Sequence, residues 1–227
     1  MSAPVSGDGR YGEHRRSRPA EPLLVLVRHG QTRSNVVTAL DTLPPGPPLT
    51  EIGLAQAERV ADALAGEPVG AVYSSIAVRA RQTAAPIAAR HSLPARQVEG
   101  VHELFCGDLE GRTDQAALEE LHDVVRSWAA GDLGRPVPGG ESAADLHARY
   151  LPAVERIWHE HPGGLLVLVS HGLAMRVAVS AMIGEASDDR PVPNTGRIVL
   201  APSGTPGGWL LKFWEAAEAP TDPTGNP

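Results

Sequence analysis

Leu23-Leu24-Val25-Leu26-Val27-Arg28-His29-Gly30 is the stretch that decides the fold, because it recurs as Leu165-Leu166-Val167-Leu168-Val169-Ser170-His171-Gly172 with one change, Arg28 against Ser170. Each octapeptide is a short apolar run that ends at a histidine and a glycine, as expected of a strand buried on both faces of a parallel sheet. Ligands of open parallel sheets bind beyond the carboxyl ends of the strands. We therefore predict that the two strands pair side by side and bring His29 and His171 together at a reaction centre.

An internal duplication would also explain the two octapeptides, so the flanking residues decide between the interpretations. The segments that follow them, 31–37 and 173–179, do not resemble each other, and no fixed period occurs elsewhere. The similarity therefore reflects two strands under the same physical demand rather than a repeat.

Strand and helix patterns alternate along the rest of the chain, which predicts an α/β fold around a mostly parallel sheet. The other predicted strands cover residues 69–73, 97–101, 196–201 and 208–214. The last two are short and joined by a turn, so we expect an antiparallel hairpin at one edge of the sheet. Helices are predicted near Ser34, from Thr50, and over 76–90, 114–130, 141–160 and 173–183. The helix from Thr50 is expected to bury Ile52, Leu54, Ala57, Val60, Ala61 and Leu64.

Length and composition indicate a single domain at residues 23–215, between segments 1–22 and 216–227 whose composition predicts disordered tails. The net charge of −7 argues against a protein that binds nucleic acid or a membrane surface. The single cysteine, Cys106, excludes an intramolecular disulfide and a cysteine-based zinc cluster. No segment has the length of a membrane span or the pattern of a signal peptide, so we expect a cytoplasmic protein.

The residues Arg28-His29-Gly30 have the chemistry expected of a phosphate site. A buried guanidinium needs an anionic partner, and a phosphate group satisfies it in a planar, bidentate way. The neighbouring positive charge lowers the pKa of His29, and a neutral imidazole can attack phosphorus. Gly30 allows the backbone to turn sharply and approach a ligand. Taken alone, the tripeptide could equally be a chance match in a loop.

Arg79 is a second candidate for the phosphate site. It lies near the start of the helix predicted at 76–90, where the helix N-terminus adds partial positive charge. Arg81 is the alternative, because residues two apart do not share a helix face. Most helical arginines are solvated, so only the position after a strand favours a functional role.

Glu103 and His171 complete the candidate set. Phosphoryl transfer to histidine needs a proton donor, and Glu103 lies closer to a predicted strand end than Asp108 or Glu110. For Asp108 and Glu110 we expect ordinary loop solvation. His171 can donate a hydrogen bond to phosphoryl oxygens as charge develops on them.

Several common catalytic motifs are missing from the sequence. It has no Walker-A loop, no GxGxxG dinucleotide motif, no His-Glu-x-x-His and no Gly-x-Ser-x-Gly. The scattered histidines and carboxylates show no spacing typical of metal ligands. The sequence therefore offers no recognisable metal site, although scattered ligands remain an alternative.

Six motifs in order resemble those of the histidine phosphatase superfamily, in its phosphoglycerate-mutase-like branch. The resemblance covers residues 23 to about 200. The motifs are Arg28-His29-Gly30-Gln31-Thr32 with Asn35, Leu49-Thr50-Glu51-x-Gly53, Ser74-Ser75 with Arg79-Ala80, Glu103 with Gly107 and Glu110-Gly111, Gly139-Gly140-Glu141-Ser142, and Ser170-His171-Gly172.

The resemblance implies a fold and a role for each matching residue. The fold would be a three-layer α/β/α sandwich with a small cap inserted after Glu103, at roughly residues 103–140. His29 would be the nucleophile that becomes a phosphohistidine, and Glu103 would protonate the leaving group and then activate water. The phosphate pocket would comprise Arg28, Arg79 and His171, with Asn35 as a further contact. The resemblance implies no metal or cofactor.

Within this family the alternatives are a phosphatase and a phosphoglycerate-mutase-type phosphotransferase. The loop reads Glu103-x-x-x-Gly107-x-x-Glu110-Gly111, as in the phosphatases, so we predict a metal-independent phosphomonoesterase acting on a small phosphorylated metabolite. A homodimer is compatible with the sequence. A non-catalytic binding protein ranks last, because every candidate catalytic position is retained.

The chain departs from the family pattern in two places. A proline-rich loop, Asp41 to Pro48, stands where many relatives have a different sequence, and we expect it at the mouth of the pocket. His102 stands where a leucine is common, and it would either contact the substrate or lie in solvent. Substrate identity depends on such positions, which follow no readable code.

Overall fold

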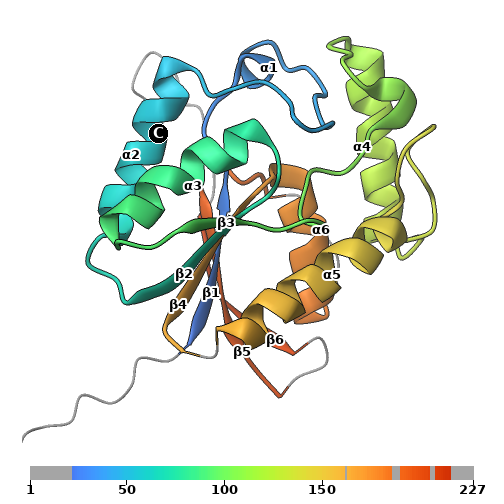
Figure 1. The fold of residues 1–227 in the computed structure, drawn as a ribbon. Coiled ribbons are helices and arrows are strands. Elements are labelled where there is room, and N and C mark those ends of the chain that lie inside the picture. The colour runs from blue at the N-terminus through green and yellow to red at the C-terminus, as the bar shows by residue number, and fades with distance from the viewer. Residues whose placement is uncertain (1–21, 162, 186–189, 205–207, 216–227) are drawn as a thin grey trace, which may run out of the picture.

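The computed structural model of the chain describes residues 22–161, 163–185, 190–204 and 208–215. Its core is a six-stranded sheet in the order β3-β2-β4-β1-β5-β6 (Figure 1). The strands are β1 (Leu23–Arg28), β2 (Val69–Ser74), β3 (Ala95–Gln97), β4 (Leu165–Ser170), β5 (Arg197–Pro202) and β6 (Trp209–Trp214). The tails predicted at 1–22 and 216–227 lie outside the described residues, except for residue 22.

The two octapeptides form the centre of the sheet. β1 and β4 pair in parallel, residue for residue, from Leu23 with Leu165 to Arg28 with Ser170. The backbone N–H of His29 donates to the carbonyl oxygen of Ser170 at 3.0 Å, so the pairing continues past the last strand residue. The predicted side-by-side arrangement is confirmed.

The remaining strands extend this pair on both sides. β2 is parallel to β4 and to β3, whereas β5 is antiparallel to β1 and to β6. The mostly parallel sheet and the antiparallel hairpin at its edge are therefore confirmed.

Helices cover both faces of the sheet, as expected of an α/β/α sandwich (Figure 1). They are α1 (Arg33–Val36), α2 (Glu51–Leu64), α3 (Val78–Arg90), α4 (Gln115–Ala129), α5 (Ala143–Glu160) and α6 (Gly172–Ile183), with a 3₁₀ turn at Gly107–Leu109. α2 and α3 lie on one face, and α5 and α6 lie on the other. Within the described ranges, no helix is long and apolar enough to cross a membrane.

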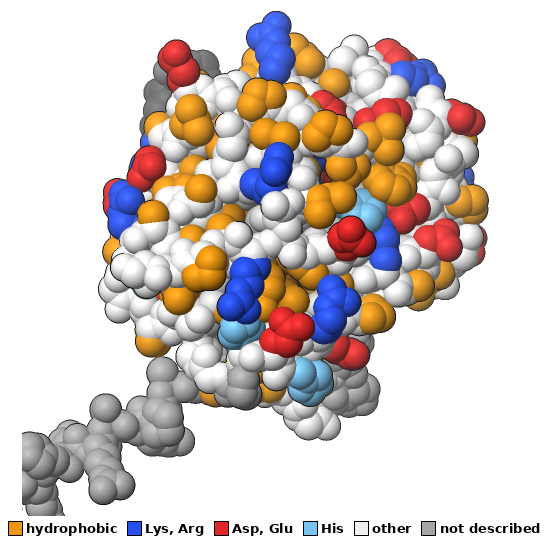
Figure 2. All heavy atoms as spheres, viewed as in Figure 1, with side chains coloured by type: hydrophobic (Ala, Val, Ile, Leu, Met, Phe, Trp, Pro, Cys, Tyr) orange, Lys and Arg blue, Asp and Glu red, His pale blue; other side chains and the backbone are white. Residues whose placement is uncertain are grey.

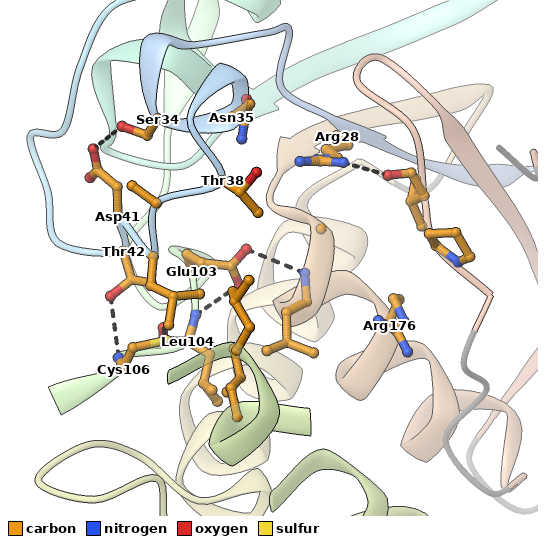
Figure 3. Close-up of a pocket in the computed structure, with 18 of the residues that line it drawn as sticks. Arg28, Ser34, Asn35, Thr38, Asp41, Thr42, Glu103, Leu104, Cys106 and Arg176 are labelled. Carbon is orange, nitrogen blue, oxygen red and sulfur yellow. Dashed lines mark hydrogen bonds between the residues drawn. The ribbon is translucent and has the colours of Figure 1, made fainter. Parts of the chain in front are cut away.

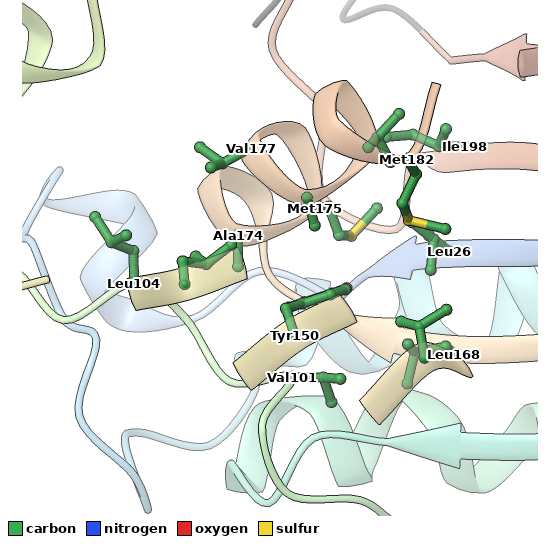
Figure 4. Packing of buried hydrophobic residues seen from close by; sticks show 14 of the residues in the cluster. Leu26, Val101, Leu104, Tyr150, Leu168, Ala174, Met175, Val177, Met182 and Ile198 are labelled. Atoms are coloured by element: carbon green, nitrogen blue, oxygen red, sulfur yellow. The ribbon is translucent and has the colours of Figure 1, made fainter. Parts of the chain in front are cut away.

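Alternation along β1 and β4 divides the core into two layers, because successive side chains of a strand point to opposite faces. Val25 and Val27 pack with α2 and α3. Leu24 and Leu26 belong to the larger cluster with the helices of the opposite face, where Leu26 and Leu168 lie close to Met175 of α6 and Tyr150 of α5 (Figure 4). A strand that is apolar at every position is thus explained by burial on both sides.

The strand predicted at 97–101 is displaced toward the N-terminus. β3 covers only Ala95–Gln97, and a loop follows it. Gly100 adopts a φ of +91°, which interrupts an extended strand. Val98 and Val101 are buried because the loop packs against the larger core cluster, which reproduces the apolar pattern of a strand.

The helix from Thr50 begins as predicted, but the residue that its first turn buries differs from the prediction. The Thr50 hydroxyl accepts a hydrogen bond from the N–H of Gly53 at 3.0 Å, which caps the helix. Ile52 and Leu54, predicted to be buried, are 58% and 47% exposed. Gly53 faces inward instead, where an added Cβ would overlap the backbone of Gln31.

On the face shown in Figure 2, exposed apolar side chains are interspersed with charges of both signs.

Gly53→Ala is expected to lower the free energy of unfolding by about 1–3 kcal/mol, because the methyl group would overlap the Gln31 carbonyl oxygen. Without that overlap, alanine would stabilise a helix interior by about 1 kcal/mol relative to glycine. Gly66→Ala is the matched control, since its added Cβ meets no described atom within 4 Å. Urea unfolding measures both variants, and equal stability would contradict the close approach of Gly53 to Gln31.

Candidate active site

The two histidines meet at the carboxyl ends of β1 and β4. His29 follows β1, and His171 follows β4 and is the N-cap residue of α6. Their rings lie edge to face with centroids 5.2 Å apart, and the side chains are 4% and 0% exposed. The predicted convergence of His29 and His171 is therefore confirmed.

The hydrogen bonding of His29 leaves one ring nitrogen available as a nucleophile. Its Nδ1 lies 2.7 Å from the carbonyl oxygen of Gly30. A carbonyl can only accept, so Nδ1 carries the hydrogen and the lone pair of the neutral ring is on Nε2. Burial lowers the pKa of His29 well below its usual value, and the positive charges of Arg28 and Arg79 lower it further. His29 is thus a neutral imidazole near pH 7.

Arg28 and Arg79 bring positive charge to His29 while keeping donors free. Arg28 Nη1 donates to the Val192 carbonyl oxygen at 2.7 Å, and Arg79 Nη2 donates to the Asp41 carbonyl oxygen at 3.1 Å. Arg28 Nε and Arg79 Nη1 are buried without a hydrogen-bond partner in the described part of the chain. Unpaired buried donors are costly, so this arrangement suits an anionic ligand such as phosphate.

His171 lies next to His29 and is fully buried. Its Nε2 is hydrogen-bonded to Ser75 Oγ at 2.7 Å, whereas its Nδ1 has no partner among the described residues. Burial lowers the pKa of His171 well below its usual value, and the nearby His29 adds to the effect. His171 is absent from the residues that line the cavity.

Glu103 caps the N-terminus of α6 (Figure 3). Its Oε1 accepts from the backbone N–H of Ala174 at 2.8 Å and of Leu104 at 2.9 Å. Its Oε2 accepts from the N–H of Leu173 at the longer distance of 3.2 Å. The carboxyl group is therefore fixed in the wall of the cavity, with Oε2 the more weakly bound oxygen.

Asn35 lines the cavity from α1. Its Oδ1 accepts from the N–H of Thr32 at 3.0 Å and from Asn194 Nδ2 at 3.2 Å. Because the acceptor oxygen is occupied by these donors, the amide nitrogen remains for a ligand. The same Asn194 group donates to the His29 carbonyl oxygen at 3.0 Å, a link that sequence reasoning missed.

These groups surround one cavity of about 700 Å³ (Figure 3). The structure places five predicted site residues on its wall, namely Arg28, His29, Asn35, Arg79 and Glu103. Arg28 is the last residue of β1, and the others come from the segments that follow β1, β2 and β3, as expected of the carboxyl edge of a parallel sheet. Arg81, the alternative to Arg79, is exposed.

The proline-rich loop lies at this cavity and is anchored by Glu110. Glu110 Oε1 accepts from the Thr42 N–H at 2.8 Å, and Oε2 accepts from the Thr42 hydroxyl at 2.5 Å. The expectation of ordinary solvation was therefore wrong for Glu110, although Asp108 is exposed as predicted. The sequence separation of 68 residues between Thr42 and Glu110 explains why no local pattern showed this pair.

The same loop encloses Arg79. Gly46 has a φ of +62°, and an added Cβ there would overlap Arg79 Nη1. Asp41 Oδ1 lies 3.9 Å from that nitrogen, and Asp41 Oδ2 accepts from the Ser34 hydroxyl at 2.5 Å. A carboxylate thus lies beside the guanidinium in the wall of the cavity. Figure 3 shows the hydrogen bond between this carboxylate and Ser34.

His102 fits neither of its two predicted environments. It is absent from the cavity wall, and both of its ring nitrogens are buried. The ring stacks on Phe105 with centroids 4.7 Å apart. Burial, aided by the positive charge of Arg149, lowers the pKa of His102 to about 4. His102 is a packing residue beneath the loop that carries Glu103.

Arg149 of α5 holds that loop. Its guanidinium forms a bidentate ion pair with Glu141, with both N–O distances 2.7 Å, and the two side chains are 17% and 15% exposed. The remaining guanidinium donors bind three nearby carbonyl oxygens, those of Gly100 (2.7 Å), His102 (2.9 Å) and Glu103 (2.9 Å). Arg149 therefore fixes the backbone that positions the Glu103 carboxyl group.

Comparisons with known proteins point to one family. Residues 24–216 match the sequence profile of the histidine phosphatase superfamily (branch 1). A probable phosphoglycerate mutase, GpmB, of Yersinia pestis is 32% identical over 159 residues, which cover 70% of this chain and 74% of that protein. The PE-PGRS family protein PE_PGRS11 of Mycobacterium tuberculosis is 30% identical over 226 residues and 89% of this chain, which spans only 37% of that relative.

Solved structures show the same similarity. A mycobacterial glucosyl-3-phosphoglycerate phosphatase in complex with VO3 superposes with a TM-score of 0.74 at 27% sequence identity. The superposition covers 86% of this chain and 99% of that structure.

Arg149→Met is expected to lower the free energy of unfolding by about 3 kcal/mol, because it leaves the Glu141 carboxylate and three carbonyl groups unpaired. Arg90→Met is the matched control, since Arg90 pairs with Glu58 and Asp62 at exposed positions. That change is expected to cost at most about 1 kcal/mol. Urea unfolding compares the two, and similar losses would contradict the anchoring role of Arg149.

Proposed function

The chain belongs to the histidine phosphatase superfamily, and on that basis we propose that it is a metal-independent phosphomonoesterase that acts on a small phosphorylated metabolite through phospho-His29. The observation that carries the proposal is a neutral His29 with a free Nε2, next to two buried guanidinium groups with unpaired donors. A neutral nucleophile beside fixed positive charge suits attack on a phosphate dianion.

In the first step Nε2 of His29 attacks phosphorus, and the bond between phosphorus and the ester oxygen breaks. Arg28 and Arg79 bind the phosphoryl oxygens, with His171 Nδ1 and the Asn35 amide as further donors. Glu103 gives a proton to the leaving oxygen, so the alcohol departs neutral. Oε2 is the oxygen suited to hold that proton, because its hydrogen bond from Leu173 is the longest.

In the second step water attacks the phosphohistidine. Glu103, now ionised, takes a proton from the water as the new P–O bond forms and the P–N bond breaks. Inorganic phosphate leaves, and His29 returns to its neutral form. The hydrogen bond from Nδ1 to Gly30 keeps the same nitrogen available throughout.

A phosphoglycerate-mutase-type transfer is the second candidate, favoured by the name of the Yersinia pestis relative. It needs the phosphoryl group to return to another hydroxyl of the same molecule before water attacks. We favour hydrolysis because the loop from Glu103 to Gly111 has the phosphatase pattern.

We further propose that residues 103–140 act as the cap. We also propose that the protein works in the cytoplasm.

His29→Ala is expected to lower kcat for 4-nitrophenyl phosphate by about three orders of magnitude or more, because no other group replaces Nε2. The acid-labile phosphoenzyme seen after rapid quenching should vanish with it. His159→Ala changes an exposed histidine and is the matched control. Wild-type turnover should persist in EDTA and should release inorganic phosphate faster than it isomerises phosphoglycerate.

Each outcome of this experiment decides one point. Full activity in His29→Ala would contradict the assignment of His29 as the nucleophile. Loss of wild-type activity in EDTA would contradict the proposal that the enzyme needs no metal. Isomerisation that outpaces phosphate release would favour the mutase.

Asp41→Asn is expected to strengthen inhibition by inorganic phosphate or vanadate by roughly three- to tenfold, because it removes a negative charge beside Arg79 while Asn still accepts from Ser34. The Asp41 carboxylate repels a phosphate bound at Arg79, and two like charges about 4 Å apart repel by about 1 kcal/mol even in water. The control is Asp108→Asn, at an exposed carboxylate. Inhibition constants measure the effect. Weaker inhibition in Asp41→Asn would show that Asp41 acts by holding Arg79 instead.

A further inference from the structure

The cavity at His29 extends far beyond the space that a phosphate needs. Its volume of about 700 Å³ is within the range of pockets that enclose whole small molecules. A phosphate group has five heavy atoms and fills on the order of 100 Å³, judged from about 30 Å³ per water. Most of the cavity is therefore available to the leaving group of the substrate.

One side of this remaining space is an apolar face of α4. Leu118, Leu121 and Val125 lie on the cavity wall at positions i, i+3 and i+7, so they share one face of the helix. Leu121 and Val125 are buried in the core, whereas Leu118 is only half-buried. Leu118 thus presents apolar surface to the cavity.

Apolar side chains from other segments line the same cavity. Leu40 after α1 and Leu173 of α6 are half-buried against the core cluster and line the cavity. Leu104, Pro191 and Val192 continue the same wall. We call Leu40, Leu118 and Leu173, which come from three different segments, the leucine wall.

Polar groups of the cavity are distributed unevenly. The two carboxylates on the described wall, Asp41 and Glu103, both belong to the phosphate end. On α4 the polar groups are His122 and Arg126, which are exposed, and Arg126 pairs with Asp123. Arg176 adds a further positive group from α6 (Figure 3). Four hydroxyl side chains also line the cavity. Those of Thr32, Ser34 and Thr42 donate to Asn35, Asp41 and Glu110, and Thr38 is exposed. Sugar hydroxyls need acceptors as well as donors, and the leucine wall supplies neither.

We propose that the preferred substrates are phosphomonoesters of bulky, largely apolar alcohols or phenols, rather than phosphorylated sugars or short hydroxy acids. The proposal rests on the phosphomonoesterase function proposed above and names its substrate class. Phosphate binds at Arg28 and Arg79, and the apolar body of the leaving group packs on the leucine wall. Burial of that body contributes to kcat/KM through surface removed from water.

A series of n-alkyl phosphates tests this directly, because chain length changes the apolar area while the reactivity of the leaving alcohol stays nearly constant. Each methylene buried is worth about fourfold in kcat/KM. We expect a rise of at least about tenfold from ethyl to hexyl phosphate. Hexyl phosphate should also exceed glycerol 3-phosphate and glucose 6-phosphate.

Variants assign the preference to the leucine wall. Leu118→Gln keeps the side-chain length and a good helix former but places an amide on the wall. It is expected to reduce the hexyl-to-ethyl ratio of kcat/KM by at least about threefold. Ala116→Gln makes a similar change on the exposed side of α4 and should keep the wild-type ratio. Leu173→Gln repeats the test from α6, should either variant fold poorly.

The possible results separate the two proposals. Turnover that does not rise with chain length, or that is highest for glucose 6-phosphate, would overturn the apolar substrate class and leave the phosphatase intact. No turnover of any phosphate ester would overturn the phosphomonoesterase function and this inference with it. A chain-length effect that Leu118→Gln and Leu173→Gln both leave unchanged would overturn the leucine wall as its origin.

Discussion

The parallel pairing of β1 with β4 is the constraint on which the rest of the structure depends. Both strands are buried on both faces, so a shift of one residue would exchange the side chains of the two core layers. The observed register places His29 against His171 and directs both toward the carboxyl edge of the sheet. Every other group of the candidate site is positioned relative to this pair.

The groups around the two histidines are arranged to stabilise two buried arginines, because an unpaired buried positive charge is costly. Arg28 and Arg79 are largely buried and are only partly satisfied by carbonyl oxygens. Asp41 lies close enough to moderate the charge of Arg79, and Glu110 anchors the loop that carries Asp41. The site thus retains unpaired donors for an anion without leaving its charge uncompensated.

Two supports of the site act from outside the cavity. Arg149 and Glu141 fix the loop of Glu103 from α5, and the N-terminus of α6 fixes the Glu103 carboxyl group itself. The leucine wall shares one of these elements, since Leu173 of α6 is the neighbour of Ala174, which donates to Glu103. Positioning of the acid and recognition of the leaving group therefore meet at the start of α6.

The sequence by itself determined the central strands, their neighbours, the helices and the cluster of His29, Arg28, Arg79 and Glu103, because apolar periodicity and strand-end position are local properties. It misplaced β3, since a buried loop with Val98 and Val101 shows the same apolar pattern as a strand. Only the tertiary structure decided which side chains satisfy one another. Ser170 replaces Arg28 in β4 because its hydroxyl donates to the Val101 carbonyl and accepts from Tyr150, contacts that span 69 and 20 residues. Such pairings depend on how distant segments pack, and no local pattern of residues records them.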